Sequence, residues 1–284
     1  TTSPPIEPQP ILGCTDDMAE NYESTATEDD GNCVYSGHDF GNSKDNLLKA
    51  IGEWVDNEAT AEAEYGHIST WNVSKITDMS ELFFDSNQPY GNMTKTFNSN
   101  ISNWNVKNVT NMEKMFKNAI EFDQDLSKWN TSKVQSMSYM FSGEYNFELQ
   151  FNSPIFTKVE NVTNMSHMFQ WNRRFNQDLS GWNTTNVVDM VRMLSNAHEF
   201  NSPIFTEVQN ANTLYLFTNA HKFNQDITKF NRNPAYIYNS LFYCNSAFKN
   251  GGQPWVDKEE DWKPGCGTSE FFISHGRTNC NCDP

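Results

Sequence analysis

A short pattern of apolar and polar residues recurs along most of the chain. Each copy opens on Trp or Phe, and most close on a Met followed, three positions later, by a second Met or Leu and usually Phe; WNVKNVTNMEKMF is the clearest. The units open at Trp71, Trp104, Trp129, Phe156, Trp182, Phe205 and Phe230. Self-similarity at a near-constant spacing is the signature of a repeat architecture. It predicts about seven units, each burying a face against its neighbours.

Within a unit, the apolar spacing is typical of a helix. Met112 is followed by Met115 and Phe116, an i, i+3, i+4 pattern that predicts one or two inward-facing helical turns. The stretches around DLSKWN and SPIFT suit short strands that pair in parallel with their neighbours. The expected fold class is α/β: a leucine-rich-repeat-like solenoid of about seven coils near 25 residues each, with short parallel strands and short helices.

A longer sequence period, which spans two units, is superimposed on the single-unit repeat. FNSPIFT at 151–157 returns at 200–206, and FNQD at 175–178 returns at 223–226. Asp125, Asp178 and Asp226 therefore occupy equivalent positions on alternate units. We expect the Asn or Gln residues of these motifs to hydrogen-bond the backbone as an inward polar ladder, which is a structural role.

The chain divides around the array into five segments. We expect a Pro-rich linker over 1–12, a small disulfide-bonded acidic module over 13–36, an N-terminal capping helix over 40–66, the repeat array over 67–250 and a cysteine-containing C-terminal cap over 251–284. Ser43 precedes apolar residues at helical spacing, which predicts the N-cap of the capping helix.

The cysteines indicate an oxidising compartment. They are six in number and lie at Cys14, Cys33, Cys244, Cys266, Cys280 and Cys282. An even number near the ends predicts disulfides that staple the terminal segments. Cys14 and Cys33 form the natural local pair, and the other four allow three pairings. Zinc is the rival interpretation, but the chain has no C-x-x-C motif.

Charge and motifs exclude several functions. A formal net charge of −16 disfavours nucleic acid and anionic membrane surfaces. No apolar run reaches the roughly 18 residues of a membrane span, so no membrane insertion is expected in this chain. The chain contains no G-x-S-x-G, P-loop or G-x-G-x-x-G motif, and no enzyme activity is expected.

Two sets of residues suggest surface chemistry. Hard oxygen ligands for calcium gather within the loop between the first two cysteines, at Asp16, Asp17, Asn21, Asp29 and Asp30. A solvated acidic turn is the alternative, and no other cofactor is expected. Asn-x-Ser/Thr triplets, which allow glycosylation in a secreted protein, occur at Asn72, Asn92, Asn100, Asn108, Asn130, Asn161, Asn164 and Asn183.

Other candidate ligands have structural interpretations. The paired methionines could bind copper(I) through their thioethers, but their register with Phe favours core packing. His198 and His221, on consecutive units, could lie close together and bind a metal or respond to pH, but no third ligand accompanies them.

The motifs resemble those of the BspA-like leucine-rich-repeat surface proteins, also seen as mycoplasma-type surface lipoprotein repeats. WNVKNVTNMEKMF and YGHISTWNVSKITDMSELF carry the resemblance, which extends from Phe40 to Phe248. The segment GCTDDMAENYESTATEDDGNC resembles a small disulfide-bonded module of secreted proteins. The resemblance implies a secreted or cell-surface protein that takes part in adhesion and protein recognition.

Three functions are weighed. The first is a secreted or cell-surface recognition and adhesion module that binds a protein or glycan through the repeat surface. The second is a structural or assembly component such as a coat or fibre protein. The third, less favoured, is a secreted enzyme acting on polysaccharide.

Overall fold

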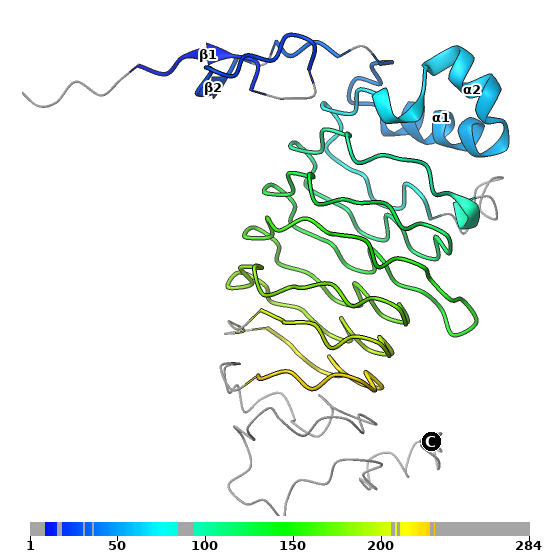
Figure 1. Ribbon diagram of the computed structural model, residues 1–284, viewed down its shortest axis with the longest axis vertical. Helices are drawn as coiled ribbons and strands as arrows, with labels where there is room; N and C mark the ends of the chain where they lie inside the picture. Colours follow the sequence, from blue (N-terminus) through cyan, green and yellow to red (C-terminus); the bar gives the residue numbers. More distant parts are fainter. Residues whose placement is uncertain are drawn as a thin grey trace, which may run out of the picture.

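The computed structural model of the protein describes residues 9–15, 19–30, 32–35, 37–84, 94–205, 208, 211–227 and 230. The chain runs from a small N-terminal module through two helices into a long stack of repeat units (Figure 1). In the module, β1 (Leu12–Gly13) pairs in parallel with β2 (Glu28–Asp29). The predicted disulfide between Cys14 and Cys33 is confirmed.

Two helices cover the end of the stack that follows the module. α1 (Lys44–Asp56) begins after its N-cap Ser43, and α2 (Glu58–Tyr65) follows at once. The Trp54 ring of α1 packs edge-on against Trp71 of the first unit, with ring centroids 5.8 Å apart. The helices therefore close the core of the first unit. Neither is long and apolar enough to cross a membrane, nor is any other helix in the described part of the chain.

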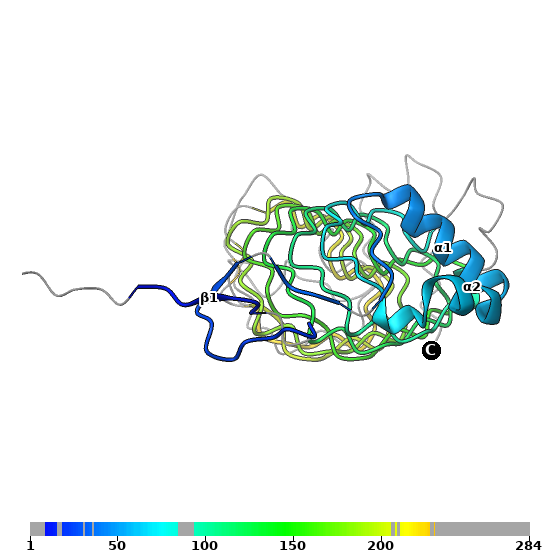
Figure 2. The ribbon, with the colours of Figure 1, turned by 90° about the horizontal axis from the view of Figure 1, so that it is seen from above.

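The predicted α/β solenoid is wrong. Among the described residues, β1, β2, α1 and α2 all precede the units, as does the single-turn 3-10 helix η1 (Ile68–Thr70). The described parts of the units, from Trp71 onward, contain turns, coil and the short 3-10 helix η2 (Thr94–Thr96), and neither α-helix nor strand. Successive units lie over one another as irregular coil turns, as the view along the stack shows (Figure 2).

The backbone hydrogen bonds explain why no helix forms at the methionine motif. The N–H groups of Met112, Lys114 and Phe116 donate to carbonyls of the next unit at 2.8–2.9 Å, rather than along their own segment. Lys114 between them has φ 55°, a left-handed conformation that an α-helix does not contain. The same kink keeps the segment from being extended, so neighbouring units are joined by isolated parallel bridges instead of strands. These bridges connect Asp78, Asn111, Ser136, Asn164, Asp189 and Asn212 in order.

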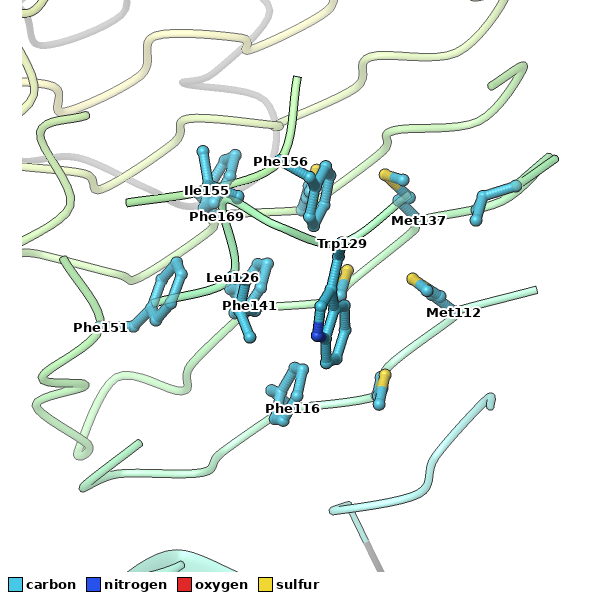
Figure 3. Packing of buried hydrophobic residues seen from close by; sticks show 14 of the residues in the cluster. Met112, Phe116, Leu126, Trp129, Met137, Phe141, Phe151, Ile155, Phe156 and Phe169 are labelled. Atoms are coloured by element: carbon cyan, nitrogen blue, oxygen red, sulfur yellow. The ribbon is translucent and has the colours of Figure 1, made fainter. Parts of the chain in front are cut away.

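Stacked aromatic side chains form the core of the array. One column has ring centroids 5.8–6.2 Å apart and planes within 12° of parallel; its members are Phe97, Phe122, Phe151, Phe175, Phe200 and Phe223. A second column includes Phe116, Phe141 and Phe169, beside the buried methionines (Figure 3). Aromatic pairs in such contact contribute roughly 0.5–1.5 kcal/mol beyond their burial. Met112 and Met137 are fully buried, which supports core packing for the methionines.

A polar ladder runs beside the first phenylalanine column. It consists of Asn98, Asp123, Asn152, Asn176, Asn201 and Asn224. The Oδ1 atom of each of the first five accepts the backbone N–H of the next member at 2.7–2.9 Å. The alternation of the FNQD (or FDQD) and FNSP motifs arises here. Gln124 in one unit and Ser153 in the next make equivalent hydrogen bonds, so the two motifs serve the same role on alternate units. Each donates to the backbone carbonyl of the preceding ladder residue at 2.9 Å.

Candidate recognition surface

One outward position in each of six units holds a large side chain on a left-handed backbone. φ lies between 54° and 61° at these positions, which we call the turn column: Glu81, Lys114, Tyr139, His167, Arg192 and Tyr215. A left-handed residue other than glycine costs on the order of 1–3 kcal/mol. The backbone N–H of each of the first five donates to a carbonyl of the next unit at 2.8–2.9 Å. These bonds fix the column rigidly.

The residues that flank the turn column determine where it faces. Met137 and Met140 are fully buried, whereas Tyr139 between them is partly exposed. The same alternation holds at Met165, His167 and Met168. Because the flanking side chains fill the core, the column side chains are directed to the surface.

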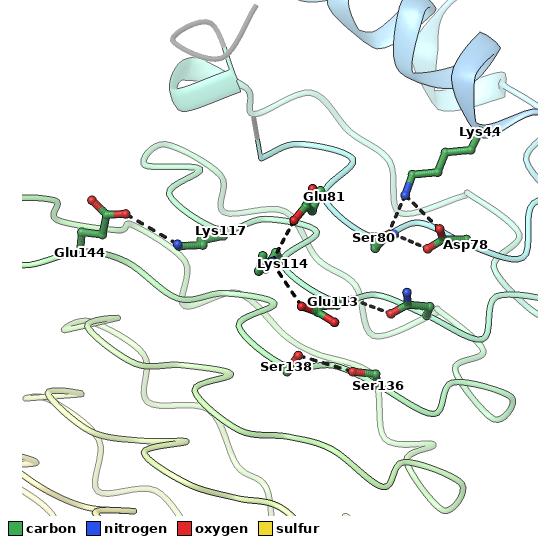
Figure 4. A network of polar contacts seen from close by, with 11 residues as sticks. Lys44, Asp78, Ser80, Glu81, Glu113, Lys114, Lys117, Ser136, Ser138 and Glu144 are labelled. Atoms are coloured by element: carbon green, nitrogen blue, oxygen red, sulfur yellow. Dashed lines mark hydrogen bonds and ion pairs between the residues drawn. The ribbon is translucent and has the colours of Figure 1, made fainter. Parts of the chain in front are cut away.

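Ion pairs occupy the part of the column nearest the helices (Figure 4). Lys114 Nζ lies 2.9 Å from Glu81 Oε1 and 3.3 Å from Glu113 Oε1. Its hydrogen bond with Glu81 raises the pKa of Lys114. Lys44 of α1 makes a similar contact with Asp78, at 3.0 Å. Exposed pairs of this kind are worth at most about 1 kcal/mol, so their main effect is to orient the side chains.

Aromatic and cationic side chains occupy the middle and far part of the column. The Tyr139 and His167 rings stack 4.2 Å apart and within 6° of parallel, and Lys117 Nζ lies 5.8 Å from the Tyr139 centroid. The Arg192 guanidinium lies 5.0 Å from the centroid of the Tyr215 ring. Burial lowers the pKa of His167, so its imidazole is neutral at pH 7. The surface therefore presents π faces and cations side by side.

An insertion in the third unit adds to this surface. Nine residues separate Phe141 from Phe151, where five separate the corresponding phenylalanines Phe116 and Phe122. The inserted loop, residues 144–150, exposes 69% of Tyr145, whose ring meets Trp171 edge-on with centroids 5.4 Å apart. The Arg173 guanidinium lies 5.6 Å from the Trp171 centroid and donates to the Tyr145 carbonyl at 3.1 Å. Trp, Tyr and Arg are the residue types that most often dominate binding energy at interfaces.

Buried polar atoms without a hydrogen-bond partner gather at the same corner. Within the described residues they are Asn118 Oδ1, Ser142 Oγ, both amide atoms of Asn172, and Arg173 Nε. Asn172 is fully buried at a position that three other units fill with alanine: Ala119, Ala197 and Ala220. Each such group costs roughly 1–3 kcal/mol. Departures of this kind from good packing concentrate at functional sites.

Sequence reasoning did not find the turn column. Its only signal is variation: between the two core residues of the methionine motif, the second position changes from Glu to Lys, Tyr, His, Arg and Tyr, while the core residues on either side are mostly Met or Leu. A position that varies among large polar and aromatic residues in an otherwise regular motif faces outward.

The predicted calcium ligands are not shown together. The side chains of Asp16, Asp17 and Asp29 lie outside the described residues. Asn21 accepts the Val34 N–H at 2.6 Å and donates to the Asn32 carbonyl at 2.8 Å, and Asp30 Oδ1 accepts the Asn32 N–H at 2.9 Å. Asn21 and Asp30 therefore hold the backbone around Cys33. In the part of the chain that the structure describes, no group of three His, Cys, Asp or Glu is placed to hold a metal, and calcium stays a prediction.

The glycosylation triplets have a backbone role. In five of them the Asn Oδ1 accepts the N–H of the Ser or Thr two residues later, at 2.9–3.2 Å: Asn72, Asn100, Asn130, Asn164 and Asn183. In Asn108 and Asn161 the amide Nδ2 donates to a carbonyl of the preceding unit. Asn92 lies outside the described residues. The turn geometry of the repeat thus explains why the triplet recurs, and glycosylation stays a prediction.

His198 and His221 lie close together, with ring centroids 4.6 Å apart. Burial, followed by the charge of His221, lowers the pKa of His198 to about 4.

Among the acidic residues of the FNQD and FDQD motifs, Asp125 and Asp178 each accept the N–H of a serine two residues later. The remaining predicted cysteines lie outside the described residues: Cys244, Cys266, Cys280 and Cys282.

The comparisons with known proteins identify the family. Residues 53–155 and 150–255 match the family described as "Mycoplasma protein of unknown function, DUF285". The chain belongs to this family. The predicted BspA-like leucine-rich-repeat assignment is wrong, because DUF285 is a different family. The first DUF285 match contains the units opening at Trp71, Trp104 and Trp129, and the second contains the later ones. No curated protein and no solved structure matches the chain.

Proposed function

We propose that the protein is a secreted or cell-surface recognition and adhesion module, without enzyme activity, that binds a protein or glycan partner through the turn column and loop 144–150. The observation that carries the proposal is the column itself. Six units present large side chains outward, and in the first five the backbone position is fixed by a hydrogen bond to the next unit. A repeat array of this kind offers an extended surface whose contacts add along its length.

The rigidity of the surface supports binding. Association costs conformational entropy for every side chain that becomes ordered on contact. In the turn column much of that cost is met in the free protein, because Tyr139 stacks on His167 and Arg192 packs on Tyr215. The exposed Tyr145 is held in the same way by Trp171. A preorganised aromatic and cationic surface is well suited to a partner with carbohydrate rings, aromatic groups or carboxylates.

The disulfide supports an extracellular location. The bond between Cys14 and Cys33 forms and persists in oxidising compartments, and such bonds are rare in the reducing cytosol. The module that it closes precedes the stack (Figure 1).

The test compares two variants on a printed array of glycans and extracellular proteins. Tyr139→Ser with His167→Ser removes the central stack of the column. Val188→Ser removes a side chain that is 58% exposed and outside the column, and serves as the matched control. We expect the wild-type protein and the control to bind the same partner, and the double variant to lose at least about tenfold in affinity, which corresponds to one aromatic anchor.

Two results would contradict the proposal. The first is a wild-type protein that binds nothing on the array. The second is equal binding by the wild type and the double variant, provided that thermal unfolding shows both to be folded. Light scattering of the same samples tests the assembly alternative, which predicts large species at modest concentration instead of a monomer.

A further inference from the structure

A cleft lies between the N-terminal module and the first three units, apart from the turn column. Its volume is about 670 Å³, within the usual range for small-molecule sites. One wall comes from the segment just after Cys33, including Tyr35, and the opposite wall from the Trp-Asn-x-Ser/Lys segments of the units. Tyr35 Oη accepts a hydrogen bond from Asn105 Nδ2 at 2.7 Å, which ties the two walls together.

The charge of the cleft is opposite to that of the chain. Among the described residues that line it are Lys75, Lys107 and Lys133 and one carboxylate, Asp39, so three positive charges less one negative give these groups a charge of +2. The chain as a whole carries −16. Lys75 Nζ lies 2.8 Å from Asp39 Oδ2, and this hydrogen bond lowers the pKa of Asp39. The ammonium groups line successive units of the stack, which suits a ligand carrying a row of anionic groups.

The remaining lining groups favour hydroxyl-bearing ligands. Apart from Tyr35 and its neighbours, the cleft is lined by Asn and Ser side chains, which donate and accept hydrogen bonds. Asn108 shows how the lysines are positioned, because its Oδ1 accepts from Lys133 Nζ at 2.8 Å while its Nδ2 donates to a backbone carbonyl. A sugar chain therefore finds partners for its hydroxyls in this cleft.

We propose that this cleft binds an acidic oligosaccharide. Its carboxylate or sulfate groups contact Lys75, Lys107 and Lys133, and its hydroxyls contact the surrounding amides. Because the cleft shares no residue with the turn column, this proposal is independent of the one made for that surface. The disulfide at Cys33 fixes one wall, so binding depends on the oxidised form of the module.

The test is calorimetric titration of the full chain with three probes. Heparin-derived oligosaccharides carry sulfates, hyaluronan oligosaccharides carry only carboxylates, and dextran oligosaccharides are neutral. We expect binding of at least one acidic probe, weaker at higher salt because the charges are screened, and no binding of dextran. The acidic probe that binds identifies which anionic group the lysines prefer.

Two variants that each lose two positive charges distinguish binding at the cleft lysines from general electrostatic attraction to the protein. Lys107→Gln with Lys133→Gln should weaken binding at least about tenfold. Lys128→Gln with Lys158→Gln removes two exposed lysines that do not line the cleft, and should weaken it less than about twofold. Absence of binding to both acidic probes, or an equal loss in the two lysine variants, would overturn the proposal.

Discussion

The polar ladder provides the sharpest test of how the stack is held together. Asp123 is the one carboxylate in the ladder, and its Oδ1 accepts the Asn152 N–H at 2.7 Å. Replacing it by leucine leaves that N–H without its acceptor at a partly buried site, whereas replacing it by asparagine keeps an oxygen in place. A hydrogen bond to a charged group contributes about 1.5–3 kcal/mol, and a lost partner costs about 1–3 kcal/mol.

We therefore expect Asp123→Leu to lower the free energy of unfolding by roughly 1–3 kcal/mol, since the bond joins two neighbouring units. Asp123→Asn keeps the oxygen acceptor but removes its charge, so it should cost clearly less than Asp123→Leu, at most about 1 kcal/mol. Urea denaturation followed by circular dichroism measures both values. The melting temperature should fall by about 2–4 °C per kcal/mol for a domain of this size. Equal loss in the two variants would refute the reasoning, because the oxygen acceptor would then not matter.

Three further predictions follow from single contacts. The folded-state pKa of His198 lies near 4, below its unfolded value, so its contribution to stability is complete above about pH 6.5 and is lost as pH falls toward 4. The stability difference between the wild type and His198→Gln should change across that window, and parallel pH curves would contradict it. Replacing Cys14 and Cys33 by serine should destabilise residues 13–36 by about 3 kcal/mol. Limited proteolysis should then cleave this segment faster than in the wild type and leave the repeat array intact. Trp129→Phe should cost about 1–2 kcal/mol in denaturant titrations, because the buried Ile101 carbonyl loses the indole N–H, while Phe156 at the equivalent position of the next unit shows that phenylalanine fits there; an unchanged midpoint would contradict this.

The sequence predicted which side chains are buried better than it predicted the backbone. Met112, Met115 and Phe116 are buried as their spacing indicates. That spacing reports only which side chains point inward, and a turn with a left-handed residue at Lys114 satisfies it as well as a helix does. The choice is made by hydrogen bonds to the next unit, which no single unit's sequence reveals.

The candidate site was less predictable than the core. The core residues and the polar ladder repeat because every unit makes the same contacts, and repetition makes them visible. The contact of Tyr139 with His167 joins residues 28 positions apart and is not repeated in other units, so no periodic sequence pattern predicts it. The interaction of Tyr145 with Trp171 depends on an inserted loop, which a repeat alignment treats only as an interruption.

The central claim is that the turn column is the binding surface, and side-chain footprinting of a complex tests it most directly. The protein is exposed to hydroxyl radicals alone and with the strongest partner from the array, and oxidation is measured by peptide mass spectrometry. The account predicts that oxidation of Tyr139, His167 and Tyr215 falls on binding, while that of Tyr22, 45% exposed in the N-terminal module, does not change. Unchanged oxidation along the column in a saturated complex would contradict it.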